Sequence, residues 1–304
     1  MKISVCIIVK NEQELIARCL QSVKDADEII VLDTGSTDLT GVVINDLNLP
    51  NVRFIEGVYG WKDDFADARN AALDYCTGDW RLVIDADEVL TVGSMDKLRL
   101  SIATAKGRTL SVRVRGEGTN SIHMSVRAFT RGVQYVGAAH EVPNVRSEGV
   151  CEAEIVFGYS PAHALDPDRM IRILSKEMLK SPNDTRIIYY FAREHWYRKQ
   201  YSKAEELFER HVRLSSFLGE RADAYLYLAR IYWLTCRGDK ARSACMNAIT
   251  INADFKEALL FMADISFEHN AKRWQEYASY ATNERVLFVR TPSQIPIDMQ
   301  APNP

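Results

Sequence analysis

Two carboxylates stand at the end of a hydrophobic stretch in the segment Trp80-Arg81-Leu82-Val83-Ile84-Asp85-Ala86-Asp87-Glu88. The run from Leu82 to Ile84 is apolar and rich in β-branched residues, which predicts a strand covered on both faces. On an extended backbone, Asp85 and Asp87 would point to the same side. Paired carboxylate oxygens suit Mg²⁺ or Mn²⁺, and such an ion can also hold a diphosphate. A solvated acidic strand end is the alternative interpretation.

Two further polar strand ends precede this segment in a strand–helix–strand pattern. An apolar run covers Ile3 to Val9 and is followed by Asn11, and a second run from Glu28 to Leu32 ends at Asp33. Apolar residues at helical spacing separate the two runs, so the pattern predicts parallel strands joined by a right-handed crossover. Ligands bind beyond the carboxyl ends of such strands. Asn11, Asp33 and Asp85 are therefore expected at one edge of a sheet.

A predicted helix at residues 66–73 places a cation close to its start. That cation is Arg69, and the helix dipole does not favour positive charge in this position. We therefore expect an anionic partner for Arg69. A surface ion pair with Asp63 or Asp67 is the alternative.

Four ordered motifs carry a family resemblance, namely Val5–Glu12, Asp33–Asp38, Asp64–Asn70 and Gly78–Glu88. Together they resemble the family 2 glycosyltransferases, and in particular the bacterial and phage branch with a helical-repeat tail. The resemblance implies an α/β domain of the GT-A fold, which is a Rossmann-like nucleotide-sugar-binding domain. It also implies a nucleoside-diphospho-sugar donor, most often a UDP-sugar such as UDP-glucose.

The same resemblance implies roles for individual residues. The base and ribose of the donor would be held by Val9, Asn11 and Asp33. Arg69 would lie near the donor diphosphate, Asp85 would contact the ribose or the sugar, and Asp87 would bind Mn²⁺ or Mg²⁺. The metal ion would neutralise the leaving group, and a carboxylate base would deprotonate the acceptor hydroxyl. Members of this family mostly invert the anomeric centre.

A second chemical segment is Tyr135–Pro143, where His140 and Glu141 are neighbours. The pair matches the His-Glu-x-Pro pattern of this branch. Glu141 is the candidate catalytic base, and His140 could orient that base or contact the metal ion or the diphosphate. A purely structural His–Glu pair is the alternative. His163 is a weaker candidate for the same pocket.

The stretch from Lys97 to Arg131 contains eight Lys or Arg residues and one acid, Glu117. Such an excess of positive charge would suit an anionic acceptor, for example a phosphorylated glycan, a lipid head group or nucleic acid. A solvated strand face is the alternative. The resemblance implies a glycan or lipid-linked saccharide as acceptor. A hydroxymethylated base in phage DNA and a protein side chain stay open as alternatives.

The last third of the chain is predicted to be helical and repetitive. The pairs Phe191-Ala192, Leu228-Ala229 and Met262-Ala263 recur at offsets of 37 and 34 residues, which is the spacing of tetratricopeptide (TPR) hairpins. Such repeats could bind a protein partner or a second copy of the chain, or support the catalytic domain. We predict a GT-A domain at 1–165, with a donor-binding half at 1–90 and an acceptor half at 91–165. A TPR-like helical domain at 166–290 and an extended tail at 291–304 would follow.

Composition limits the remaining choices. The net charge of −3 gives no overall basic footprint for nucleic acid. The six cysteines form no C-x-x-C pair, which indicates reduced, buried thiols. No stretch is long enough to span a membrane, so we expect a soluble cytoplasmic protein. The rival class is a non-catalytic adaptor with a relic donor domain, against which stand the retained acids Asp33, Asp85, Asp87 and Glu141.

Overall fold

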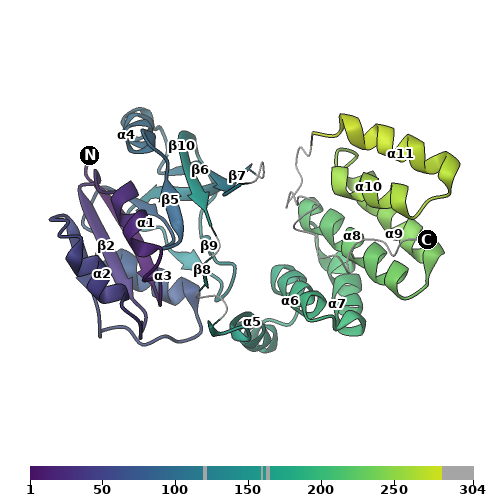
Figure 1. The fold of residues 1–304 in the computed structure, drawn as a ribbon, viewed down its shortest axis with the longest axis horizontal. Helices are drawn as coiled ribbons and strands as arrows, with labels where there is room; N and C mark the ends of the chain where they lie inside the picture. Colours follow the sequence, from purple (N-terminus) through teal and green to yellow (C-terminus); the bar gives the residue numbers. More distant parts are fainter. Residues whose placement is uncertain (119–121, 159, 162–164, 283–304) are drawn as a thin grey trace. The chain divides into compact units, whose positions relative to one another are not determined.

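The computed structural model divides the chain into two compact units, Met1–Ile173 and Leu174–Pro304. It describes residues 1–118, 122–158, 160–161 and 165–282 (Figure 1). Two predictions, the role of His163 and the extended tail at 291–304, lie outside the described residues. The boundary between the units lies inside helix α5 (Arg169–Lys180), a few residues after the predicted boundary at 165.

The first unit is built on one mixed sheet of eight strands. These are β1 (Ile3–Val9), β2 (Glu28–Asp33), β3 (Val52–Ile55), β4 (Trp80–Val83), β5 (Glu88–Leu90), β6 (Thr109–Gly116), β7 (Ile122–Thr130) and β10 (Val150–Phe157). Their order is β3-β2-β1-β4-β7-β6-β10-β5. β3, β2, β1 and β4 pair in parallel, which confirms the predicted strand–helix–strand start, and β7 runs antiparallel to both β4 and β6.

Helices on both faces bury the central strands of this sheet. They are α1 (Ile16–Ser22), α2 (Thr40–Asp46), α3 (Phe65–Asp74) and α4 (Ser94–Thr104). Successive side chains of a strand point to opposite faces, so β1 contributes to two cores. Val5 and Ile7 pack in the core that contains residues of α1 and α4, whereas Cys6 packs in the core that contains residues of α3. This explains why the sequence of β1 is apolar without alternation.

The acidic segment after β4 differs from its prediction. β4 ends at Val83, and Ala86 and Asp87 form a turn in which the backbone N–H of Glu88 donates to the carbonyl of Asp85 (3.0 Å). The extended backbone predicted through Asp85 and Asp87 is therefore wrong. The turn allows the two carboxylates to occupy different surroundings.

The strand β6 is largely buried, although two of its residues are arginines. Only Arg113 is exposed, and every other residue is buried except the partly exposed Arg115. The reason is position in the sheet, since β6 lies between β7 and β10. Arg113 and Arg115 mark one face of this interior strand.

The second unit consists of helical hairpins, as the repeat spacing predicted. Its helices after α5 are α6 (Thr185–Tyr197), α7 (Tyr201–Leu214), α8 (Leu218–Leu234), α9 (Gly238–Ile251), α10 (Lys256–Asp264) and α11 (Glu268–Tyr280). They pack as the pairs α6–α7, α8–α9 and α10–α11 (Figure 1). The recurring small residues Ala192, Ala229 and Ala263 are all buried. An α/β domain followed by TPR-like helices is thus confirmed.

Two further predictions can be checked in the described residues. Cys236 is exposed, so the expectation of buried thiols is wrong for that residue, although the other five cysteines are buried. None of the described helices combines the length and the apolar character that a membrane crossing requires.

Candidate active site

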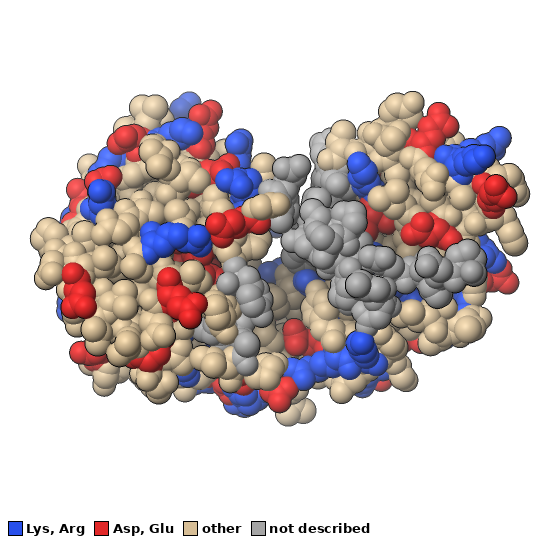
Figure 2. All heavy atoms as spheres, viewed as in Figure 1, with Lys and Arg blue, Asp and Glu red and all other residues tan. Residues whose placement is uncertain are grey.

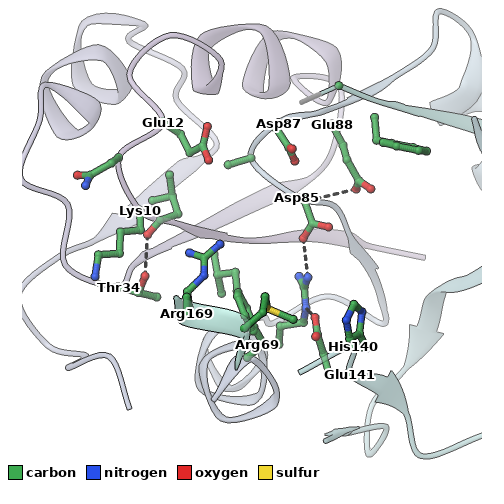
Figure 3. A pocket seen from close by; sticks show the side chains of 18 of the residues that line it. Lys10, Glu12, Thr34, Arg69, Asp85, Asp87, Glu88, His140, Glu141 and Arg169 are labelled. Carbon is green, nitrogen blue, oxygen red and sulfur yellow. Dashed lines mark hydrogen bonds and ion pairs between the residues drawn. The ribbon is translucent and has the colours of Figure 1, made fainter. Parts of the chain in front are cut away.

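A pocket of about 670 Å³ lies at the carboxyl ends of β1 and β4 (Figure 3). Of the eight predicted site residues it brings together seven, which are Val9, Asn11, Arg69, Asp85, Asp87, His140 and Glu141. Asp33 ends β2 and does not line the pocket. Its carboxylate accepts hydrogen bonds from the backbone N–H (3.0 Å) and the hydroxyl (2.6 Å) of Ser36, so it shapes the turn after β2.

The loops after β1 and β2 hold each other at one side of the pocket. Asn11 has a left-handed backbone (φ 58°), which asparagine tolerates better than most residues. Its side-chain oxygen accepts from the N–H of Thr37 (2.7 Å), and its own N–H donates to the hydroxyl of Ser36 (3.0 Å). The carbonyl of Val9 accepts from the N–H of Thr34 (2.9 Å). These contacts fix two polar strand ends side by side.

Arg69 joins two of the predicted acids across the pocket wall. Its Nη2 contacts Asp85 Oδ1 at 2.6 Å and its Nε contacts Glu141 Oε1 at 2.5 Å, with only 8% of its side chain exposed. The expected anionic partner exists, and it is supplied by the chain itself. A surface pair with Asp63 or Asp67 is therefore wrong. Burial opposes the charged form, but the two carboxylates outweigh it and raise the pKa of Arg69.

Arg127 is a second buried cation in this cluster, and the sequence placed it only within the basic stretch. In the ladder between β6 and β7, Ser111 pairs with Val126 and Leu110 pairs with Ala128, so Arg127 falls on a β-bulge. Bulges redirect side chains and are frequent next to active sites. Here the guanidinium lies 2.8 Å from Glu88 and 3.6 Å from Asp85. The bulge depends on strand register, which the sequence alone does not show.

The two acids of the turn have opposite protonation behaviour. Burial would raise the pKa of Asp85, but Arg69 and Arg127 prevail and lower it to about 2. Burial, reinforced by the charge of Asp85, raises the pKa of Asp87 to about 6. Asp85 is therefore a firmly ionised anchor of the arginine pair. Asp87 is a carboxylate whose negative charge is poorly compensated within the protein.

Two glutamates that the sequence did not assign to the site also have raised pKa values. Burial raises the pKa of Glu88 to about 7 against the opposing effect of Arg127, and its Oε2 accepts from the N–H of Asp85 (2.8 Å). Burial also raises the pKa of Glu12 to about 7, although the hydroxyl of Ser160 donates to it (2.7 Å). Both glutamates line the pocket.

The loop of His140 and Glu141 lies between the short strands β8 (Tyr135–Val136) and β9 (Val142–Pro143). The carbonyl of Ala138 accepts from the N–H of Phe65, the first residue of α3, at 2.9 Å. Gly137 (φ 90°) and His140 (φ 52°) both adopt left-handed conformations, which is unusual for histidine. The loop thereby brings Glu141 to the same helix that supplies Arg69.

The charge of the pocket fits a divalent cation. Among the described residues that line it, six are acids and four are Lys or Arg. No group of three or more His, Cys, Asp or Glu among the described residues is placed to hold a metal ion by itself. Mg²⁺ typically takes one or two carboxylates and completes its shell with phosphates and water. Asp87, with its uncompensated charge, fits that donor set, and His140 stays a predicted second ligand.

Three of the eight cations of the basic stretch are paired with acids. Arg99 pairs with Asp27 (2.9 Å), Arg115 pairs with Glu154 (3.0 Å), and Arg127 is taken into the pocket cluster. On the face drawn in Figure 2, basic and acidic side chains are interspersed. These pairs neutralise part of the excess of positive charge, while the other five cations of the stretch are exposed, namely Lys97, Lys106, Arg108, Arg113 and Arg131.

Comparisons with known proteins agree with this architecture. Residues 4–138 match the family model described as glycosyl transferase family 2. The chain is 31% identical over 204 residues to the SPbeta prophage-derived glycosyltransferase SunS of Bacillus subtilis, a match that covers 62% of this chain and 48% of SunS. It is 46% identical over 99 residues to a TPR repeat-containing protein of Synechococcus elongatus, covering 32% of this chain and 23% of that protein. The chain thus spans less than half of either relative.

One of the solved structures that match the chain is that of residues 1–349 of S. aureus TarS in complex with UDP-GlcNAc. Its TM-score is 0.46 at 13% sequence identity, and the alignment covers 94% of this chain and 92% of that one.

Proposed function

We propose that this chain, which carries a family 2 glycosyltransferase domain at residues 4–138, transfers one sugar from a UDP-sugar such as UDP-glucose to an acceptor hydroxyl. The observation that carries the proposal is the meeting of Glu141 and Asp85 on one guanidinium, beside Asp87, in a pocket at the strand ends. A ligand in an open α/β sheet binds at this place. The donor would occupy the side of Asn11 and Asp87, and the acceptor the side of Glu141.

Glu141 is the proposed catalytic base. Its carboxylate accepts the proton of the acceptor hydroxyl while the acceptor oxygen forms a bond to the anomeric carbon. The bond from that carbon to the phosphate oxygen breaks, and its electron pair leaves with the nucleoside diphosphate. This single displacement inverts the anomeric centre. Arg69 holds the carboxylate of Glu141 in place through its Nε (2.5 Å).

A divalent cation, Mn²⁺ or Mg²⁺, would neutralise the developing charge on the departing diphosphate. Asp87 is the residue proposed to hold it, with His140 as a second candidate. The acids in the lining outnumber the bases, so a doubly charged diphosphate would be repelled from this pocket without such a cation.

For the acceptor we favour a glycan or lipid-linked saccharide. The pairing of Arg99, Arg115 and Arg127 with acids offsets part of the positive charge that would favour an anionic acceptor. Nucleic-acid binding would require several unpaired cations facing the phosphates. Duplex DNA containing hydroxymethylated bases is therefore the contrasting acceptor, together with a peptide bearing serine side chains.

The test is release of nucleoside diphosphate from a panel of nucleotide sugars in the presence of Mn²⁺, with and without each acceptor. We expect release from one UDP-sugar, stimulation by a saccharide acceptor, and loss of both in Asp87→Ala. The matched control is Asp74→Ala, which removes a carboxylate from α3 outside the pocket lining. Absence of release from every donor, including slow hydrolysis, would contradict the proposal. Stimulation by DNA or peptide alone would replace the saccharide acceptor.

A further inference from the structure

We propose that Arg169 binds the diphosphate of the donor, a task that the resemblance implied for Arg69. This inference rests on the proposed function, because it names the residue that recognises the donor's charged group. Arg169 lies outside residues 4–138, the part of the chain that matches the family model. It begins helix α5 and belongs to the same compact unit as the pocket.

Arg69 is already occupied by carboxylates of the protein. Its Nη2 and Nε contact Asp85 and Glu141, and its side chain is 8% exposed. Only Nη1 has no hydrogen-bond partner, and that atom is buried. Arg127 is similarly engaged with Asp85 and Glu88. Neither guanidinium can form a bidentate contact with a phosphate without giving up a buried ion pair, which is costly.

Arg169 is engaged differently. Its side chain lines the pocket and points into it, between Lys10 and Arg69 in the view of Figure 3. The guanidinium lies over the ring of Phe65, 5.2 Å from its centroid. Among the residues described by the structure, no carboxylate forms an ion pair with it, and its Nε is buried without a hydrogen-bond acceptor. An aromatic ring thus holds this cation in the pocket, and its Nε–H has no acceptor among the described residues.

The nearest acids are taken by another arginine of the same helix. Arg172 contacts Asp63 (2.9 Å) and Asp166 (2.8 Å). This pairing anchors the first turn of α5 to the loop before α3 and leaves Arg169 toward the pocket. Arg172 therefore has a structural role, and Arg169 faces the pocket.

The placement of Arg169 is unfavourable unless an anion binds there. It carries positive charge in the first turn of a helix, where the dipole disfavours a cation. Burial lowers its pKa, which reflects the cost of removing the guanidinium from water. A diphosphate would offset both effects and offer the planar, bidentate geometry that arginine recognises. Lys10, the remaining cation of the lining, is exposed and has no such cost.

The experiment measures binding of UDP, inorganic pyrophosphate and uridine by calorimetry in the presence of Mn²⁺. We expect Arg169→Gln to weaken UDP and pyrophosphate by about 10- to 100-fold, the range for one charge-assisted hydrogen-bonding group, and to leave uridine unchanged. Arg169→Lys should recover part of the loss, because it restores the charge but not the fork. Lys176→Gln is the matched control, since it removes one charge from α5 at an exposed residue outside the lining.

The outcomes separate this inference from the function on which it rests. Tight UDP binding by Arg169→Gln would overturn the role of Arg169 and leave the proposed function standing. Equal loss of UDP and uridine, with a lowered unfolding temperature, would show a structural role and also overturn it. Failure of the unaltered protein to bind UDP or pyrophosphate would overturn both.

Discussion

The two units differ in how completely their buried charges are neutralised by neighbouring side chains. In the helical unit, Arg230 Nη2 lies 2.6 Å from Glu257, and both side chains are less than 10% exposed. In the pocket, Asp87 and Glu12 have raised pKa values, and Arg169 has no ion-pair partner among the described residues. In the helical unit each charge of the Arg230–Glu257 pair is neutralised by the other, which we call a closed pair. In the pocket, the charges of Asp87 and Arg169 are less completely neutralised by the protein. The difference separates groups that hold the fold from groups that await a substrate.

The helical unit has one carboxyl group that complicates this contrast. Glu220 is buried, and burial raises its pKa to about 7. Like Glu88 it has an arginine nearby, since Arg186 lies 3.4 Å and His211 lies 4.0 Å from its oxygens, but it does not line the pocket. An incompletely compensated charge alone therefore does not identify a site. A cavity beside the charge is also required.

The largest expected effect is on catalysis, in Glu141→Gln. A glutamine can still accept from Arg69 Nε but cannot accept a proton, so transfer should fall by about 10²- to 10⁴-fold while UDP binding persists. The measurement is initial transfer rate beside UDP affinity. Glu152→Gln, an exposed site on β10, is the control. Near-normal transfer by the Glu141→Gln variant would remove Glu141 from the role of base.

The next effect is on stability, in Arg230→Ala of the helical unit. Removing one partner of a buried ion pair leaves the other charged and desolvated, which should cost about 3–5 kcal/mol in the free energy of unfolding. Replacing both residues, as Arg230→Met with Glu257→Leu, should recover most of that loss. Urea unfolding measures both. If the single variant is as stable as the double variant, the charges of Arg230 and Glu257 do not depend on each other for stability.

The smallest effect is a pH-dependent gain of stability in Asp87→Asn. The folded-state pKa of Asp87 is raised to about 6, so its carboxyl stabilises the fold at low pH and loses that contribution as pH rises through about 6. At about pH 7.5 in the absence of metal, the variant should therefore be more stable by about 1–3 kcal/mol, since one pKa unit is about 1.4 kcal/mol. Near pH 4 the difference should disappear.

Asp85→Asn is the matched comparison for this pH experiment. The pKa of Asp85 is lowered to about 2, so its ionised form stabilises the fold above pH 4 and that contribution is lost on acidification toward pH 2. This variant should be less stable at neutral pH. Thermal unfolding at several pH values measures both variants. Equal shifts in the two proteins would show that the acids of this turn are not distinguished by their arginine neighbours.

Sequence reasoning succeeded where local pattern determines structure. The apolar runs of β1 and β2 and the repeat of small residues at Ala192 and Ala229 depend on burial, which composition records directly. It failed where long-range register decides the outcome. The bulge at Arg127 and the interior position of β6 come from the order of strands in the sheet, which no single segment specifies.

The candidate site shows the same division. Seven of its predicted residues meet in one pocket. Asn11, Asp85 and Asp87 do so because polar residues at the ends of parallel strands converge. Arg69 comes from α3, and His140 and Glu141 come from the loop between β8 and β9. Glu12 and Glu88 appeared only within motifs and were not predicted as site residues. Arg169 was assigned to the helical domain, because a sequence boundary was drawn at residue 165. Its place in the pocket follows from the packing of its guanidinium over the ring of Phe65, a contact between segments far apart in the sequence.

The division of the chain inside α5 has a consequence for modularity. Its first turn contains the pocket residue Arg169 and the anchor Arg172, and the same helix continues into the unit that starts at Leu174. The two units are therefore not interchangeable cassettes that could recombine at residue 165. A helical tail exchanged there would remove Arg169, the proposed diphosphate ligand, together with Arg172. Natural or engineered exchange of such tails would have to keep this one helical turn with the first unit.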